Sequence, residues 1–239
     1  MGSISLSVVQ ENRCYVCPTR NVCLASDANN SQLAQLPDHF RCVETLSRGQ
    51  HLYRAGDTAV AHYHVRAGML KTYVIDAQGG QYVTGFYLPG EVLGNIQVAG
   101  VFSETAIALE TSSVCELDEN GMVGCADMGL VVPLLRQLAN NAGIQGQQQI
   151  NLRQSSAQHR FAGFCVMYAQ RLERLGRDCT HLPTPMSRTD IASYLGMTLE
   201  SLSRVISKLQ STEVISASRY AIDILQPDTL NSLGIHVRN

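Results

Sequence analysis

The sequence predicts an α+β fold with three parts: an antiparallel β-roll of the jelly-roll type, a long helix, and a C-terminal winged helix-turn-helix. Residues 29–120 alternate between apolar and polar side chains and are interrupted by frequent glycine, a pattern typical of short strands in an antiparallel roll. Proline stands at position 133 and does not recur before residue 157, which favours one long helix. Two helix caps separated by a glycine turn follow at 187–198, as in a helix-turn-helix.

The composition is that of an ordinary globular protein. The chain has 239 residues, of which 45% are hydrophobic and 16% charged, enough for one large domain or two small ones. No segment approaches eighteen uninterrupted apolar residues, and the first residues lack a basic region followed by a long apolar run. We therefore expect no membrane span, no signal peptide and a cytoplasmic location. Thiols stay reduced there, so the eight cysteines favour metal ligation or reactive thiols over disulfides.

The charge is unevenly divided along the chain. Residues 151–239 hold ten Lys/Arg against seven Asp/Glu, a balance of +3, while residues 1–150 hold eight against thirteen, a balance of −5. A basic C-terminal part on an acidic body is consistent with a DNA-binding end, because phosphate contacts supply much of the affinity for DNA.

Three cysteines near the start have the spacing C-x2-C-x5-C: Cys14, Cys17 and Cys23. Three soft ligands within ten residues can cover one face of a metal centre, and a fourth must come from elsewhere. Zinc would usually be bound by a second close pair, which is absent, so the triplet is more typical of a cubane iron–sulfur cluster with four thiolates. Cys115, in the strand-like segment 113–117, is the best candidate for the fourth ligand. The other cysteines are interpreted as small apolar core or incidental residues: Cys42, Cys125, Cys165 and Cys179.

These patterns divide the chain into four segments. They are a cysteine-rich segment at 1–28, a sensor β-roll at 29–132, a dimerisation helix at 133–160 and a winged helix-turn-helix at 161–239.

The long helix allows two interpretations, a surface helix packed on its own roll or a dimerisation helix. Gly143 and Gly146 weaken it by about 1 kcal/mol each relative to alanine, and polar residues in a paired seam would set register at a cost in stability. One heptad phase of the long helix gives the seam Leu134, Leu138, Asn141, Gln145, Gln148 and Leu152.

A second helix is predicted from about 158 to 175, ending at Gly176.

The helix-turn-helix can be predicted residue by residue. Ser187 can cap a first helix and Asp190 can bond back to it, Gly196 supplies the tight turn, and Thr198 caps a second helix. The outer face of that second helix offers side chains that reach base edges and phosphates from the major groove, and residues 214–224 are predicted to form a wing. The expected DNA contacts are Arg188, Thr198, Glu200, Ser201, Ser203, Arg204 and Lys208.

Segments 82–91, 109–116 and 190–196 resemble the FNR branch of the CRP/FNR superfamily of bacterial transcription regulators, which includes the regulators called Anr. The resemblance implies a β-roll of the cyclic-nucleotide-binding type and an oxygen-labile [4Fe-4S] cluster on the triplet and Cys115. It further implies a homodimer that binds a TTGAT-N4-ATCAA palindrome, with Glu200, Ser203 and Arg204 reading bases, and that activates anaerobic genes with RNA polymerase. Pro18 departs from the pattern, because it removes a backbone N–H beside Cys17.

A cyclic-nucleotide receptor on the same fold is the first alternative. Receptors of that kind resemble the pattern Gly-Glu followed by Arg-Ser-Ala, and Gly90 and Glu91 provide the first half. Glu104 stands where the arginine should be, and a carboxylate there would repel the cyclic phosphate. We therefore expect no cyclic nucleotide.

A metalloenzyme of the cupin type is the second alternative. Gly56, His62 and His64 resemble half of a cupin metal motif, but the downstream glutamate and the second half are missing. His62 and His64 share one strand face, so an exposed polar face is the simpler interpretation. We therefore expect no enzyme activity.

Overall fold

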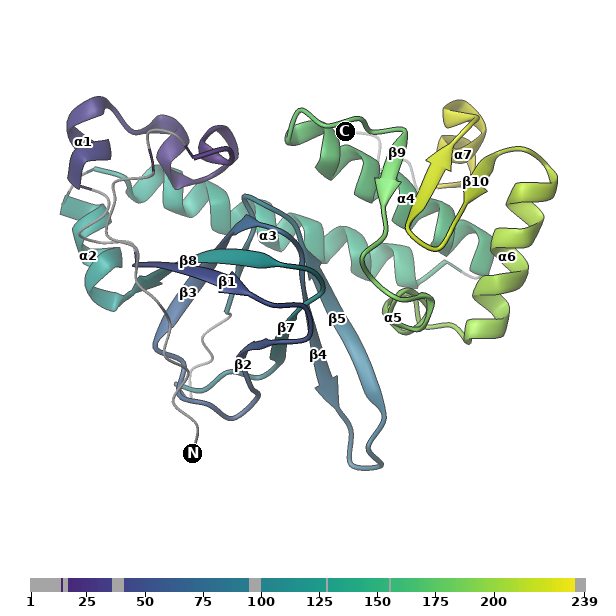
Figure 1. Cartoon of the computed structure of the whole chain (residues 1–239), viewed down its shortest axis with the longest axis horizontal. Helices are drawn as coiled ribbons and strands as arrows, with labels where there is room; N and C mark the ends of the chain where they lie inside the picture. Colours follow the sequence, from purple (N-terminus) through teal and green to yellow (C-terminus); the bar gives the residue numbers. More distant parts are fainter. Residues whose placement is uncertain are drawn as a thin grey trace. The chain divides into compact units, whose positions relative to one another are not determined.

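A computed structural model describes Cys14 and residues 17–35, 41–94, 100–127, 129–154 and 156–234. The chain divides into two compact units, which are described separately. One comprises Met1–Gln78 with Thr84–Ala142, and the other Gly79–Val83 with Gly143–Asn239. The predicted order of β-roll, long helix and winged helix-turn-helix is confirmed (Figure 1).

The β-roll consists of two four-stranded sheets with the strand orders β1-β8-β3-β6 and β2-β7-β4-β5. Tyr63 and Val65 of β3 point into the core between the sheets, where the ring of Tyr53 stacks on that of Phe102 with centroids 3.9 Å apart. Gly68 lies in the turn after β3 at φ +79°, and a Cβ there would meet Ser112 Oγ at 2.3 Å, so the turn requires glycine. The strands are β1 (Arg41–Leu46), β2 (His51–Tyr53), β3 (Ala61–Ala67), β4 (Leu70–Ile75), β5 (Gln81–Tyr87), β6 (Val92–Leu93), β7 (Thr105–Ala108) and β8 (Ser112–Asp118).

The N-terminal segment packs at one end of the roll, beside α2 (Figure 1). It forms two short 3-10 helices, η1 (Arg20–Val22) and η2 (Leu24–Asp27), and then α1 (Asn30–Gln35). A separate hydrophobic cluster joins this segment to the end of β8 and to α2 (Glu119–Asp127). Burial of this apolar surface, at about 25 cal/mol per Å², fixes the segment that carries the cysteine triplet. The cluster consists of Leu24, Ala25, Ala28, Leu117, Cys125 and Leu130.

The long helix α3 spans Val131–Leu152. Two amide side chains fix its first half to the roll. Gln137 Nε2 donates to the Gly90 carbonyl at 2.8 Å, and Asn141 donates to the Val92 carbonyl while accepting from the Val92 N–H. Asn141, which we placed in a dimer seam, is therefore bonded to an edge strand of its own roll.

The second unit is a winged helix-turn-helix. A three-stranded sheet with the order β10-β11-β9 carries the predicted wing, and the helix predicted at 158–175 is confirmed. Gln148 of α3 is buried here and donates to the Tyr194 carbonyl at 2.9 Å. None of the described helices is long and apolar enough to cross a membrane. The elements are α4 (Ala157–Arg174), β9 (His181–Pro183), α5 (Arg188–Tyr194), α6 (Leu199–Ser211), β10 (Ile215–Ala217), β11 (Ala221–Ile224) and α7 (Pro227–Leu233).

Candidate functional site

Four cysteines from distant parts of the chain line one pocket in the first unit: Cys14, Cys17, Cys23 and Cys115. The pocket encloses about 450 Å³, counting the open space at its mouth. The triplet comes from the N-terminal segment and Cys115 from β8, so the packing of that segment on the roll brings them together. The remaining lining residues are Thr19, Leu24, Ala25, His64, Val65 and Arg66.

Short-range hydrogen bonds shape the segment that carries the triplet. The Cys17 carbonyl accepts the Arg20 N–H at 3.1 Å, which starts the first turn. Cys23 then caps η2, because its Sγ accepts the Ala25 N–H at 3.3 Å. Cys17 Sγ and Thr19 Oγ1 lie 3.2 Å apart. The sequence thus folds locally into two consecutive turns that aim cysteines at the same pocket.

Burial in the pocket favours the neutral thiol of Cys23 when no metal is bound. Burial raises the pKa of Cys23 to about 12, and the neighbouring Cys17 and Cys14 raise it further, against the Ala25 N–H and Arg20, which lower it. A thiol must lose its proton to bind a metal, so ligation at Cys23 releases a proton and the metal must supply the compensating positive charge.

A single metal ion and an iron–sulfur cluster require different arrangements of the donor sulfurs. Within the described residues, no three His, Cys, Asp or Glu side chains are close enough to share one metal ion. A single zinc ion would require its sulfurs about 2.3 Å from one point. A cubane cluster offers a separate iron to each of four thiolates, so the sulfurs need not converge. Four cysteines around one partly apolar pocket fit the cluster.

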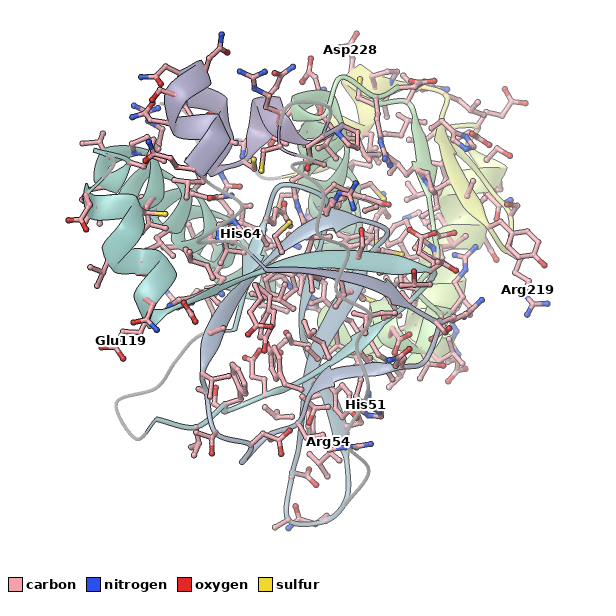
Figure 2. The ribbon with its side chains drawn as sticks, turned by 60° about the vertical axis from the view of Figure 1, so that its left-hand side comes forward. His51, Arg54, His64, Glu119, Arg219 and Asp228 are labelled. Carbon is pink, nitrogen blue, oxygen red and sulfur yellow. The ribbon has the colours of Figure 1, made fainter. Side chains whose placement is uncertain are left out.

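His64 also lines this pocket, which corrects one prediction. We expected His62 and His64 to form an exposed polar face, but His64 is only 5% exposed. Burial lowers the pKa of His64 to about 4, with a smaller contribution from His62, so the imidazole is neutral. The prediction was wrong for His64 because the N-terminal segment folds over that face of β3 (Figure 2), and no local pattern in the sequence indicates this.

The remaining cysteines lie outside the pocket lining. Cys125 and Cys165 are fully buried, which confirms them as apolar core residues, and Cys179 is partly exposed. The strand register places Cys42 of β1 directly opposite Cys115 of β8, although the Cys42 side chain lies outside the described part of the structure.

The helix-turn-helix has the local structure that we predicted. Ser187 Oγ accepts the Asp190 N–H at 3.0 Å and Asp190 Oδ2 accepts the Ser187 N–H at 3.1 Å, which completes a capping box. Gly196 adopts φ +58° in the turn. Thr198 Oγ1 accepts the Ser201 N–H at 3.1 Å and caps α6. The buried face of α6 consists of the four residues that we expected: Leu202, Val205, Ile206 and Leu209.

The outer face of α6 presents the polar residues predicted to contact DNA. Arg204 Nη2 lies 2.5 Å from Glu200 Oε1, and both side chains are more than 70% exposed. Ser203 Oγ donates to the Leu199 carbonyl at 2.9 Å, and Lys208 is exposed. In the free protein, the two expected base-reading charges are therefore paired with each other.

Arg188 lies apart from this face. Its Nη2 donates to the Ser218 carbonyl at 2.8 Å, which ties the start of α5 to the wing turn. Arg219 projects from that turn (Figure 2), 5.5 Å above the exposed ring of Tyr220. Arg219 and Tyr220 belong to the predicted wing but were not among the expected DNA contacts.

Together, a β-roll with a cysteine-lined pocket and a winged helix-turn-helix define a ligand- or metal-responsive transcription regulator. A Crp-like helix-turn-helix domain model matches residues 159–233, and a cyclic nucleotide-binding domain model matches residues 43–126.

Known proteins support the same class. The chain is 31% identical to a fumarate and nitrate reduction regulatory protein of Salmonella typhimurium, over 95% of this chain and 92% of the relative. It is 32% identical to the protein of that name from Vibrio cholerae, over 92% and 90% respectively. The structure of FixK2 from Bradyrhizobium japonicum superposes with a TM-score of 0.71 at 24% identity, covering 81% of this chain and 97% of that one.

The chain belongs to the CRP/FNR family of transcription regulators, and within it to the branch of the fumarate and nitrate reduction regulatory proteins. This confirms the family that the sequence predicted. The protein is thus a transcription regulator of the FNR type.

Proposed function

We propose that this regulator senses oxygen through a [4Fe-4S] cluster bound by Cys14, Cys17, Cys23 and Cys115, and that cluster assembly promotes dimerisation and DNA binding. The observation that carries the proposal is the convergence of these four cysteines, and of no other described cysteine, on one pocket. The bound cluster would supply the reactivity toward oxygen, and the four thiolates would hold it.

Packing around the pocket offers a route from the cluster to the long helix. Leu24 and Ala25 line the pocket and also belong to the hydrophobic cluster at the end of the roll. Leu130, just before α3, is buried in that same group of hydrophobic residues, and Leu134 of α3 packs against the group. A bound [4Fe-4S] cluster that holds the N-terminal segment in place would therefore stabilise the start of α3. In this way one ligand would shift the equilibrium between monomer and dimer.

The exposed side of α3 is the surface that a second copy would cover. Leu135 and Leu138, one turn apart on the helix, are exposed by 58% and 36%, and neighbouring apolar side chains on an exposed helix face favour pairing. Leu138 and Gln145 of the predicted seam are on exposed positions, whereas Leu134 packs on its own chain. We therefore centre the proposed dimer contact on Leu135 and Leu138.

We further propose that α6 enters the major groove of a TTGAT-N4-ATCAA-type palindrome in the cytoplasm. Glu200, Ser203 and Arg204 would read bases and Lys208 would contact phosphate. Bound in this way, the dimer would activate anaerobic genes through RNA polymerase. We expect no regulation by a cyclic nucleotide, because Glu104 stands where the receptor pattern has an arginine and a carboxylate there would repel the cyclic phosphate.

Anaerobic purification followed by iron and sulfide analysis tests the proposal. We expect one [4Fe-4S] unit per chain. Serine replacement of Cys14, Cys17, Cys23 or Cys115 should abolish it, whereas Cys125→Ser and Cys165→Ser should not. Cys42→Ser is the sharpest control, because Cys42 faces Cys115 in the strand register. Stoichiometric zinc without sulfide, or loss of iron in Cys42→Ser but not in Cys115→Ser, would overturn the assignment.

A further inference from the structure

One wall of the cysteine pocket contains a histidine that the proposed ligand set does not use. His64 of β3 is paired with Cys115 of β8 in the antiparallel register. Residues directly opposite each other have their side chains on the same face of the sheet, with Cβ atoms about 4.5–5.5 Å apart. Both side chains line the pocket, and Figure 2 shows His64 on the side of the sheet that faces the N-terminal segment.

The imidazole of His64 is buried among apolar side chains. His64 is 5% exposed, and Leu24, Ala25 and Val65 line the same pocket. A leucine would fill the space without burying two polar nitrogen atoms, each of which costs free energy unless it makes a hydrogen bond. A neutral imidazole carries one N–H donor, and a bound cluster would present sulfur acceptors to the walls of the pocket.

We infer that His64 is a positioning residue of the cluster site, which donates its imidazole N–H to a sulfur of the bound cluster or to the thiolate of Cys115. The inference rests on the proposed cluster and names a contact beyond its four ligands. Hydrogen bonds to the sulfurs are among the main determinants of how an iron–sulfur cluster behaves. Groups that hold metal ligands in place in this way typically contribute 10–100-fold to metal affinity.

The test compares two replacements of His64 in the full-length, anaerobically loaded protein. His64→Gln keeps an N–H donor, whereas His64→Leu fills the space without one. The measurement is the rate at which an iron chelator bleaches the visible absorption of the cluster under anaerobic conditions. We expect His64→Leu to lose its cluster about tenfold faster than the unmodified protein, and His64→Gln to lose it at nearly the unmodified rate.

His62→Leu is the matched control. His62 lies on the same strand and the same face as His64, is half-buried, and does not line the pocket. It should leave the bleaching rate unchanged. Equal rates in all four proteins would overturn the role of His64 while leaving the proposed cluster intact. Failure of both His64→Gln and His64→Leu to assemble a cluster would also overturn the inference. That result would show that the site requires the imidazole itself and not only an N–H donor, which glutamine also provides.

A spectroscopic measurement provides an independent readout. Protein labelled with ¹⁵N-histidine and chemically reduced should show a histidine nitrogen coupled to the cluster in pulsed electron paramagnetic resonance. The coupling should persist in His62→Leu and disappear in His64→Gln. Persistence of the coupling in His64→Gln would refute the contact. Absence of iron and sulfide from the unmodified protein would overturn the proposed function and this inference together.

Discussion

Arg204→Ala should weaken binding to the palindrome and relax the preference for one G·C pair in each half-site. A bidentate arginine–guanine contact is worth about 1–3 kcal/mol of discrimination, or roughly 5- to 150-fold in Kd at 1.4 kcal/mol per tenfold. Arg204 must first leave Glu200, to which it is bonded at 2.5 Å. An exposed pair at i,i+4 is worth about 0.3–0.5 kcal/mol, so the measured loss in each half-site should fall short of the contact energy by that amount.

The assay is equilibrium binding of the cluster-loaded protein to the palindrome and to single-base variants of it. Arg204→Lys is the control, because lysine keeps the positive charge but lacks the planar fork that matches guanine. We expect Arg204→Lys to lose base preference nearly as completely as Arg204→Ala, and to keep more affinity for unrelated DNA. If Arg204→Ala weakens binding to every variant by the same factor, Arg204 contacts phosphate and the reasoning about base readout fails.

Three further predictions concern other parts of the molecule. Lys208→Ala should weaken binding to all DNA sequences alike and reduce the salt slope by about 1 for each phosphate that the lysine no longer neutralises, as measured by titration over a range of salt. Leu138→Glu should shift cluster-loaded protein from dimer to monomer in sedimentation experiments, because it places a charge on the proposed paired face of α3. Asn141→Ala should lower the free energy of unfolding by about 1–3 kcal/mol in urea titrations, because it leaves the Val92 N–H and carbonyl without their side-chain partner.

Each of these predictions has a matched control on the same helix. Ser207→Ala lies on the exposed side of α6 beside Lys208, and an equal change in salt slope would contradict the role of Lys208. Gln147→Glu adds a charge at another exposed position of α3, and an equal loss of dimer would show that charge alone is responsible. Asn140→Ala removes an exposed amide, and a similar loss of stability would contradict the anchoring role of Asn141.

The features that the sequence predicted correctly depend on neighbouring residues. The capping box of Ser187 and Asp190, the turn at Gly196 and the cap at Thr198 each involve residues at most four positions apart. Strand alternation likewise predicted the roll. Such local preferences can be read from the sequence because, in a natural protein, each one favours the conformation that its segment has in the native fold.

The features that sequence reasoning missed depend on register between distant segments. The burial of His64 requires the N-terminal segment to fold over β3, and the placement of Asn141 requires α3 to lie along β6. A heptad count cannot distinguish a polar residue in a dimer seam from one that caps an edge strand of its own chain, because both occur at the same helical spacing. Cys115 was chosen as the fourth ligand because it lies in a strand-like segment at the end of the roll, and the structure places it in the same pocket as the triplet.

The ion pair between Glu200 and Arg204 gives salt two opposing effects on this regulator. Both side chains are largely exposed, so added salt weakens the attraction between their charges. Added salt therefore reduces the attraction of the protein to phosphate while releasing Arg204, the side chain that we propose reads a base. The ratio of specific to nonspecific binding should consequently rise with ionic strength. The regulator would therefore discriminate best between DNA sequences at high ionic strength, where its total affinity for DNA is lower.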